Sequence, residues 1–389
     1  MTYPAKAKSA EGNTVSNDCS LHSIFTFESL YQGYVSARKG KRNKHAVQKF
    51  EKEITTNIAN LLDEIHSQTY VPIPPRKFFI SCKATGKKRE IAAPSFRDSV
   101  VQHTLYNAIY DIFDRGFIFD SYGCRRGKGT HKASDRCQKF LRKHSGDLYY
   151  LQMDIRKFYY SIRHDILKES IERKIKDPNV VDLIMSYCDE PSGVGLNIGN
   201  LMSQLFGLIF LDRFDHFVKR TLRQKHYIRY VDDSVIIGLT RDEAYRLKDA
   251  CKSYLETNLD VTFSKWKISK IKNGINFVGY RTWKSRKFIR KRSLHNFSKS
   301  VKTGDVLSIQ SILSHAKCSS SYQYLINNIV TNIDLRIVNK LHEGIRHVIR
   351  SMIIRDKQRR SHEKREHKQE RADHSNPLVH IPNNPHRFP

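Results

Sequence analysis

The sequence is poor in the features that mark membrane proteins, secreted proteins and zinc-ribbon proteins. No run of about 18 apolar residues occurs, so a membrane-spanning helix is not expected. The first residues, MTYPAKAKSAEGN, lack the apolar core of a signal peptide, which predicts a cytoplasmic protein. The seven cysteines include no C-x-x-C pair and are odd in number, which argues against a zinc site or a disulfide framework.

Negative charge is also scarce. The 389 residues include 39 Asp plus Glu against 69 Lys plus Arg, which gives a formal net charge of +30. Such a field is of no use to an enzyme of neutral small molecules, and it indicates an acidic partner, above all nucleic acid. Hydrophobic residues still make up 39% of the chain, with 20 Phe and 19 Tyr among the aromatics, so a packed core is expected.

Three carboxylates interrupt apolar strand patterns and form the candidate site. Asp154 follows the apolar run LYYLQM, and Asp232 and Asp233 break the β-rich run HYIRYVDDSVIIGL. A buried carboxylate without a partner is costly, so neighbouring strands that bring the three together would need a cation between them. Hard oxygen ligands favour Mg²⁺ over zinc, and two such ions can clamp both oxygens of an in-line phosphoryl displacement. An ordinary hairpin turn is the alternative explanation of the Tyr-Val-Asp-Asp string.

The order of motifs around these carboxylates resembles that of reverse transcriptases. RYVDDSVIIG and QMDIRKFYYSIRHDIL are similar to the two catalytic palm motifs of that family. Further motifs occur in matching order between about residues 76 and 285. They are REIAAPSFRDSVVQH (Arg89–His103), SYGCRRGKGTHKA (Ser121–Ala133), IGNLMSQ (Ile198–Gln204), LDVTFSKWK with Lys265, and NFVGY (Asn276–Tyr280), which is similar to the primer grip.

The resemblance implies metal-dependent DNA synthesis on an RNA template. In that family pattern Asp154 and Asp232 bridge two Mg²⁺ ions, for which Mn²⁺ is a substitute. Asp233 is the weaker third ligand, and the Ile155 carbonyl helps to hold the nucleotide metal. The attacking group is the primer 3′-hydroxyl, so the protein contributes positioning and charge neutralisation.

The resemblance also implies a nucleotide site. Arg89 grips the triphosphate through a bidentate guanidinium contact. Tyr159 excludes a ribose 2′-hydroxyl by its bulk, with ordinary packing as the alternative. Lys265 neutralises or protonates the leaving pyrophosphate, with a plain surface lysine as the alternative. The remaining residues are Ile198, Gly199 and Gln204 at the nucleotide and Phe277, Val278, Gly279 and Tyr280 at the primer.

Two residues of the IGNLMSQ motif narrow the resemblance. Reverse transcriptases of the intron and retroviral kinds mostly begin this motif with Gln and end it with Ser-Pro, whereas this chain has Ile198 and Gln204. With GKGTHKA upstream, the variant resembles the enzymes of diversity-generating retroelements, which copy a template RNA and misincorporate opposite its adenines. A Gln at position 198 could hydrogen-bond the nucleotide sugar, and Ile offers only dispersion contacts, so a weaker check on mispairs is expected. A plain core isoleucine is the alternative reading of Ile198.

The expected fold is α/β (α+β), a right hand with fingers, a helical thumb and a palm whose small antiparallel sheet is backed by helices. We predict a flexible N-terminal arm over residues 1–28, fingers and palm over 29–285, a thumb over 286–354 and a charged flexible tail over 355–389. The implied partners are template RNA, a cDNA primer, their RNA–DNA duplex, dNTPs and a small basic helical accessory oligomer, with no membrane.

Two other interpretations stay open. A retron-type or phage-defence reverse transcriptase would share the catalytic motifs, and Ile198 and Gln204 favour the diversity-generating kind over it. A non-catalytic RNA-binding protein could retain a polymerase shape, but the presence of all three carboxylates argues against it.

Overall fold

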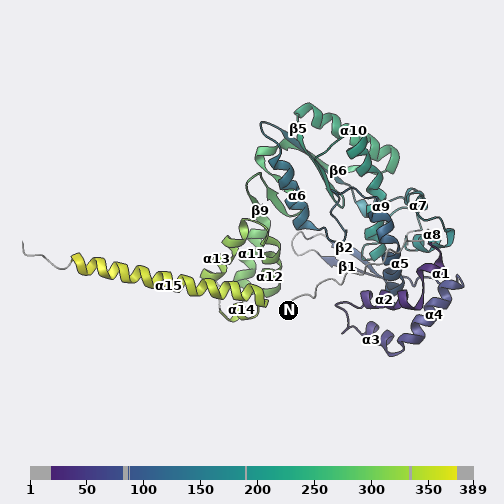
Figure 1. The fold of residues 1–389 in the computed structure, drawn as a ribbon, viewed down its shortest axis with the longest axis horizontal. Helices are drawn as coiled ribbons and strands as arrows, with labels where there is room; N and C mark the ends of the chain where they lie inside the picture. The colour runs from purple at the N-terminus through teal and green to yellow at the C-terminus, as the bar shows by residue number, and fades with distance from the viewer. Residues whose placement is uncertain (1–18, 82–85, 87, 189–190, 333–334, 375–389) are drawn as a thin grey trace, which may run out of the picture. The chain divides into compact units, whose positions relative to one another are not determined.

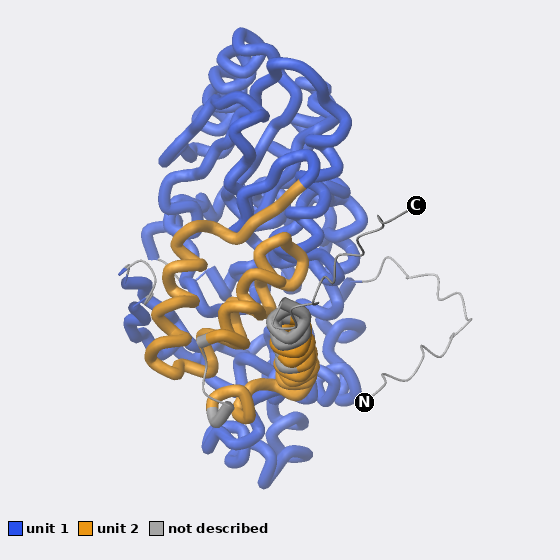
Figure 2. Tube along the Cα trace, turned by 90° about the vertical axis from the view of Figure 1, so that its left-hand side faces the viewer, with its two compact units in different colours: residues 1–285 blue, residues 286–389 orange. Residues whose placement is uncertain are grey.

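The computed structural model describes residues 19–81, 86, 88–188, 191–332 and 335–374. The chain divides into two compact units, Met1–Ser285 and Arg286–Pro389, which are blue and orange in Figure 2. The division falls at the position where the sequence analysis separated the palm from the thumb. Among the described residues, none of the helices has the length and apolar character that a membrane crossing requires.

A four-stranded antiparallel sheet lies at the centre of the first unit among its described residues, in the order β4–β5–β3–β6. The strands are β3 (Tyr149–Ile155), β4 (Tyr227–Tyr230), β5 (Asp233–Leu239) and β6 (Phe263–Lys270). The apolar runs predicted β3, β4 and β5. The mixed helix and strand fold, with this small sheet backed by helices, confirms the predicted right-hand class.

The two faces of this sheet are covered by different elements, because successive side chains of a strand point to opposite faces. Leu151, Met153 and Ile155 pack into a core shared with α9 (Leu201–His216) and α10 (Arg241–Leu259). Tyr150 belongs to a second core with α6 (Thr130–Arg142) and β7 (Ile275–Phe277). Figure 1 shows α6 lying along the sheet, and Asp154 shares the strand face of Tyr150.

A helical layer and a hairpin complete the first unit. The helices are α2 (Phe27–Ala37), α3 (His45–Lys52), α4 (Ile54–His66), α5 (Phe96–Asp114), α7 (His164–Glu172) and α8 (Pro178–Met185). The hairpin consists of β1 (Arg76–Ser81) and β2 (Lys88–Ala93), which pair antiparallel. Short turns of helix lie at Phe158–Ser161, Phe217–Thr221 and Ile271–Asn273, and β8 (Tyr280–Thr282) pairs with β7.

The N-terminal boundary differs from the predicted arm over residues 1–28. Helix α1 (Leu21–Ile24) and the start of α2 fall inside that range, and Leu21, Ile24 and Phe25 are buried. A side-chain cap explains the early start, since the Thr26 hydroxyl accepts from the Ser29 amide and the Ser29 hydroxyl from the Thr26 amide. The rest of the predicted arm, residues 1–18, lies outside the described residues.

The second unit is helical with its own core. After β9 (Lys287–Ile289) come α11 (Lys291–Thr303), α12 (Val306–Ala316), α13 (Ser321–Asn332), α14 (Leu335–Asn339) and α15 (Glu343–His374). Its buried residues recur at helical spacing, as in Ile309 and Leu313 of α12 and Leu325, Ile326 and Ile329 of α13.

The predicted flexible tail over residues 355–389 is also different in the structure, because α15 continues through His374. This stretch lacks an apolar period, which is why the sequence suggested a tail. Pairs at i,i+4 support the helix instead, with Arg359 at 3.7 Å from Glu363 and His362 at 3.1 Å from Glu366. Residues 375–389 lie outside the described residues.

Candidate active site

The structure brings the three sequence-predicted carboxylates to one end of the central sheet. Asp154 is the next-to-last residue of β3, Asp233 opens β5, and Asp232 lies in the turn between β4 and β5. Asp154 and Asp233 are directly opposite each other in the β3–β5 register. Lys265 of β6 is the cross-strand partner of Asp154 on the other side, with an exposed side chain. Three carboxylates and one lysine therefore lie together at one end of the sheet.

The environment of Asp232 disfavours its charge. Burial raises the pKa of the Asp232 carboxyl above its ordinary value, and the Asp154 charge raises it further, while Arg229 and Arg89 act in the opposite direction. Two facing carboxylates in a half-buried site repel each other, so a cation between them would stabilise both. The donor set of Asp154 and Asp232 consists of hard oxygens, which fits Mg²⁺.

Neighbouring side chains separate the roles of the three carboxylates. The Ser264 hydroxyl of β6 donates to Asp154 Oδ2 and fixes that carboxylate. Gln152 Nε2 donates to Asp233 Oδ1 at 2.9 Å and to the Asn276 carbonyl at 2.9 Å. Within the described part of the chain, no group of three His, Cys, Asp or Glu side chains is close enough to hold one ion. Asp233 is thus engaged by Gln152, whereas Asp232 is the carboxyl on which the charge of Asp154 acts.

The turn that carries Asp232 is held by a buried ion pair that the sequence analysis missed. Arg229 of β4 is 1% exposed, and its Nε donates at 2.7 Å to Asp215 of α9, which is 0% exposed. Tyr227 also donates to Asp215, at 2.8 Å. Arg229 Nη1 donates at 2.8 Å to the carbonyl of Val231, a β-branched residue in the left-handed region at φ 57°. The ion pair therefore stabilises an unfavourable backbone conformation directly before Asp232.

The glycine of the SYGC motif completes this turn. A side chain at Gly123 would meet both the Val231 side chain and its amide nitrogen at 2.6 Å. The Tyr122 amide donates to the Arg229 carbonyl at 2.9 Å, so the motif lies along the edge of β4. In the sequence, only the order of the motifs indicated that these two segments lie near each other, because the composition around Gly123 and Arg229 gives no sign of a contact.

Two of the predicted nucleotide-side residues, Tyr159 and Arg89, interact electrostatically with Asp232. Tyr159 lies on a short turn after β3 and packs beside Gly207 of α9, where a Cβ would approach its ring at 3.4 Å. Burial raises the pKa of the Tyr159 phenol, with Cys124 and Asp232 adding to the effect. Its neighbour Phe158 is buried, as expected for a core residue. Arg89 is exposed on β2, and the nearby Lys83 and Lys87 lie outside the described residues.

The loop before α9 joins the sheet of the first hairpin through its backbone. The Ala92 amide of β2 donates to the Ile198 carbonyl at 2.8 Å. Gly199 has φ 117°, and a side chain there would meet the Ala92 carbonyl at 2.8 Å. Asn200 caps α9, because its side chain accepts from the Met202 amide at 2.8 Å, and Gln204 is exposed on the first turn.

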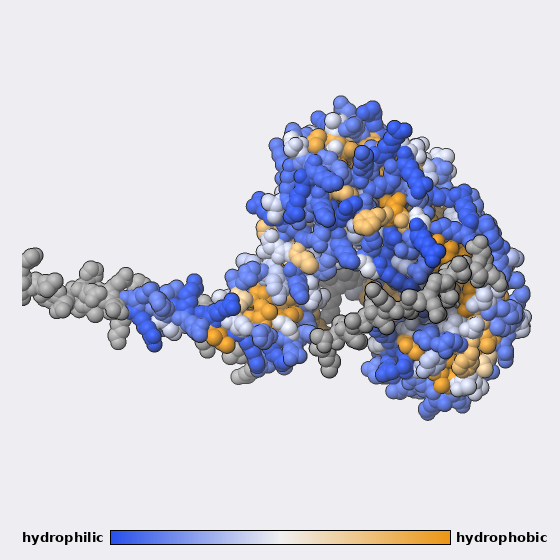
Figure 3. All heavy atoms as spheres, in the orientation of Figure 1, coloured by the Kyte–Doolittle hydropathy of each residue, from blue (hydrophilic) through white to orange (hydrophobic). Residues whose placement is uncertain are grey.

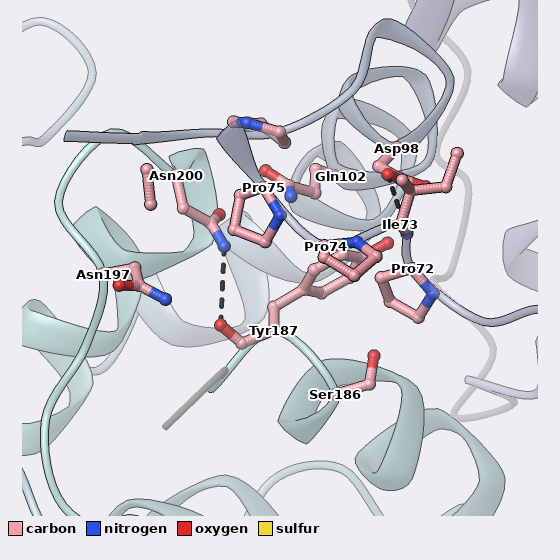
Figure 4. Close-up of a pocket in the computed structure, with 12 residues that line it drawn as sticks. Pro72, Ile73, Pro74, Pro75, Asp98, Gln102, Ser186, Tyr187, Asn197 and Asn200 are labelled. Atoms are coloured by element: carbon pink, nitrogen blue, oxygen red, sulfur yellow. Dashed lines mark hydrogen bonds between the residues drawn. The ribbon is translucent and has the colours of Figure 1, made fainter. Parts of the chain in front are cut away.

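A proline-rich pocket lies behind this loop and couples it to the fingers (Figure 4). Asp98 of α5 accepts hydrogen bonds from Tyr70, from Ser95 and from the Ile73 amide, so it fixes the segment that carries Pro72, Pro74 and Pro75. Asn200 Nδ2 donates to the Tyr187 carbonyl across the pocket at 3.4 Å. The position of the Ile198–Asn200 loop thus depends on packing against α5 and β2.

We expect Gly199→Ala to lower both stability and polymerisation, because the new methyl group would push β2 away from the loop. A strained backbone residue costs on the order of 1–3 kcal/mol, which is about 2–10 °C in melting temperature for a chain of this size. Gly40→Ala is the matched control, since Gly40 also has a positive φ (72°) but nothing within 4 Å of its Cβ position. Equal losses of primer extension in the two variants would show that contact with β2 has no special role.

The predicted primer-grip residues form a tight hairpin. The turn at its tip is partly exposed to solvent, whereas its two aromatic side chains are buried. Phe277 and Tyr280 are fully buried, and the Tyr280 hydroxyl lies 3.0 Å from His131 Nδ1. Val278 and Gly279 make the turn between β7 and β8 with positive φ angles of 44° and 89°. Any contact with a primer would therefore come from the backbone of this turn, while the aromatic residues anchor it to α6.

Comparison with known proteins shows which family model and which proteins this chain is similar to. Residues 80–282 match the family model of the reverse transcriptase (RNA-dependent DNA polymerase). The protein YkfC of Escherichia coli is 26% identical over 62% of this chain and 74% of its own length. The group II intron-encoded protein LtrA of Lactococcus lactis is 26% identical over 49% of this chain, which spans only 32% of LtrA. Among solved structures, apo telomerase from Candida tropicalis has a TM-score of 0.49 at 14% identity, covering 76% of this chain and 62% of that one.

The family match begins within β1 and ends within β8. It therefore includes the whole central sheet, the carboxylates at one end of it and the loop before α9. Its extent is more than half of the chain. The chain belongs to the reverse transcriptase (RNA-dependent DNA polymerase) family.

Proposed function

We propose that this chain makes cDNA from a template RNA, by two-metal nucleotidyl transfer at the end of the palm sheet that carries Asp154 and Asp232. The position of Asp154, Asp232 and Asp233 at one end of the β3–β5 pair, in a chain of net charge +30, carries the proposal. An acidic pair inside a basic field repels phosphate unless cations sit between them. When bound, two Mg²⁺ ions would neutralise charge on the phosphates and activate the primer 3′-hydroxyl.

Each residue then has a defined task in the proposed reaction. Asp154 and Asp232 hold the metals, with the Ile155 carbonyl and Asp233 as supporting ligands. Asp233 is suited to the lesser part because it already accepts a hydrogen bond from Gln152. Ser264 keeps the Asp154 carboxylate oriented toward the site. Lys265, opposite Asp154, is placed to neutralise or protonate the leaving pyrophosphate.

The substrate-positioning residues lie around this end of the sheet. Arg89 on β2 would grip the triphosphate, since its charge already acts on Asp232. Tyr159, which packs against α9 next to Asp232, would exclude a ribose 2′-hydroxyl by its bulk. The Val278–Gly279 turn would support the primer end, and the helical second unit would act as the thumb on the RNA–DNA duplex.

We further propose that the enzyme is of the diversity-generating kind, with errors opposite template adenines. The support is Ile198, where an apolar side chain stands at a loop fixed to β2, and the exposed Gln204 in place of proline. A small basic helical oligomer would be its accessory partner. A retron-type or phage-defence enzyme is the second candidate, and a non-catalytic RNA-binding protein is the third.

Primer extension tests the proposed activity. A DNA primer annealed to RNA should be extended with dNTPs and Mg²⁺, and EDTA should stop the reaction. The same primer on a DNA template and the same mixture with rNTPs test the template and the sugar. Failure to extend the RNA template, alone and with the accessory protein, would favour the non-catalytic candidate.

Replacing Ile198 by Gln should lower the error frequency opposite template adenine by about fivefold, because one regained hydrogen bond is worth about 1 kcal/mol. The measurement is sequencing of cDNA copied from an RNA with all four bases, with Ile198→Leu as the size-matched apolar control. Error rates opposite the other three bases should change less. An unchanged spectrum in Ile198→Gln would contradict the proposed role of Ile198.

A further inference from the structure

A groove with basic walls follows the outward side of α6 and the loop before it. The residues that matter in its lining are one exposed aromatic, Phe119, and the cations Lys128, Lys132, Arg136, Lys139 and Arg142. The surrounding surface of the first unit is predominantly hydrophilic in Figure 3. All of these residues belong to the first unit.

The local charge is far higher than the average of the chain. Residues 125–143 hold eight Lys or Arg and one Asp. Part of this charge is structural, since Arg125 binds Asp114 and Arg136 binds Asp120. Lys132, Lys139 and Arg142 are exposed, and together with Arg136 they recur at three- or four-residue steps along one side of α6. Successive turns of the helix therefore present a cation about every 5.4 Å along the groove.

The aromatic member of the groove is unusually accessible. Phe119 is 65% exposed, although Phe side chains are commonly buried. Lys128 Nζ lies 3.7 Å from the centre of its ring and donates to its backbone carbonyl at 2.8 Å. The ring is thus held in place by a cation while most of its surface remains open. A positioned aromatic ring beside a row of cations can stack a base and bind the adjoining phosphates.

The groove is separate from the end of the sheet that carries Asp154 and Asp232. The inward side of α6, including Cys137 and Phe140, packs on Tyr150 and Ile228 of the sheet. Tyr150 precedes Asp154 by four residues on β3, which is about 13 Å along an extended strand. The groove opens on the other side of the helix, so the proposed polymerase reaction does not account for its residues.

We propose that this groove binds an unpaired strand of RNA, away from the end of the sheet that carries Asp154 and Asp232. An unpaired strand fits better than a duplex, because its bases are free to stack on Phe119, whereas the bases of a duplex are already stacked. The identity of the strand as RNA rests on the proposed function, which supplies a template RNA. The groove would hold a part of that template that is not being copied.

Binding of a fluorescent 20-nucleotide unpaired RNA tests this assignment. Phe119→Ala should weaken binding about tenfold, and Lys132→Gln/Lys139→Gln should reduce the salt dependence, with a slope smaller by about 1.4 for two lost phosphate contacts. Lys168→Gln/Lys252→Gln is the charge-matched control, since both lysines are exposed on α7 and α10. An RNA hairpin with a fully paired stem and only a short loop should bind the variants and the wild type with affinities that differ by less than twofold.

Three outcomes would overturn the proposal. They are unchanged affinity of Phe119→Ala for the unpaired RNA, equal losses for the hairpin, and tighter binding of unpaired DNA than of RNA of the same sequence. Primer extension on a short annealed template with a three-nucleotide overhang separates this proposal from the proposed function. That rate should be the same in the groove variants and the wild type. A wild type that binds the RNA but extends nothing would count against the polymerase assignment and leave the groove intact.

Discussion

Replacing Asp232 by Asn is expected to reduce nucleotide addition by about 10³-fold or more while the protein remains folded. The amide keeps the shape of the side chain but removes one of the two converging anions. Metal-based charge stabilisation is worth several kcal/mol, and each 1.36 kcal/mol is a factor of ten in rate. Asp154→Asn should behave alike, whereas Asp233→Asn should retain more activity because Asp233 is already engaged by Gln152. Single-turnover primer extension measures all three.

Thermal melting with and without Mg²⁺ provides a second readout of the same substitution. The wild-type melting temperature should rise with Mg²⁺, because an ion that binds only the folded state stabilises it. In Asp232→Asn this rise should shrink, and the metal-free protein should be no less stable than the wild type, since the repulsion from Asp154 is gone. Asp249→Asn on exposed α10 is the charge-matched control and should keep both activity and the Mg²⁺ response. Full activity in Asp232→Asn would overturn the proposed reaction.

The sequence could predict those parts of the palm that carry strong local signals. The strands β3 and β5 were visible because their apolar runs fill two packed cores, and Asp154 and Asp232 stood out against those runs. Strand β6 was not predicted. It lies at the edge of the sheet and reads FSKWKISK, in which lysines and serines remove the apolar alternation. A hydrophobic pattern therefore does not predict edge strands whose exposed positions are occupied by lysine.

The residues that position the site were harder to find, because their role depends on contacts between distant segments. Ser264 reaches Asp154 only through the β3–β6 register, and Asp215 meets Arg229 only because α9 packs on the sheet face that carries Arg229. Neither contact has a spacing that could be read along the chain. The motif that resembles a primer grip shows the opposite case, since NFVGY stood out in the sequence but both of its aromatic residues prove to be core.

Replacing Arg229 by Lys is expected to cut the extension rate by about 10- to 100-fold, more than its effect on stability would predict. Lysine keeps the charge near Asp215 but loses the planar fork, so it cannot also bind the Val231 carbonyl. The turn before Asp232 would then relax from its left-handed conformation and shift the Asp232 carboxylate, which we propose as a metal ligand. The Mg²⁺ concentration needed for half-maximal rate should increase, which a purely structural loss would not cause. Ile58→Ala, a cavity variant in α4, controls for lost stability.

Asp215→Asn separates the stabilising and positioning parts of the same ion pair. It leaves the buried guanidinium without its counter-charge, which should cost about 3–5 kcal/mol of unfolding free energy. The triple variant Tyr227→Phe/Asp215→Leu/Arg229→Met removes the guanidinium and the Asp215 carboxylate together, so stability should recover toward the wild type because neither is left buried without the other. Its extension rate should nevertheless stay low, since nothing holds the Val231 carbonyl. Recovery of both stability and rate in the triple variant would show that the ion pair only fills space, and that the turn carrying Asp232 holds its shape by itself.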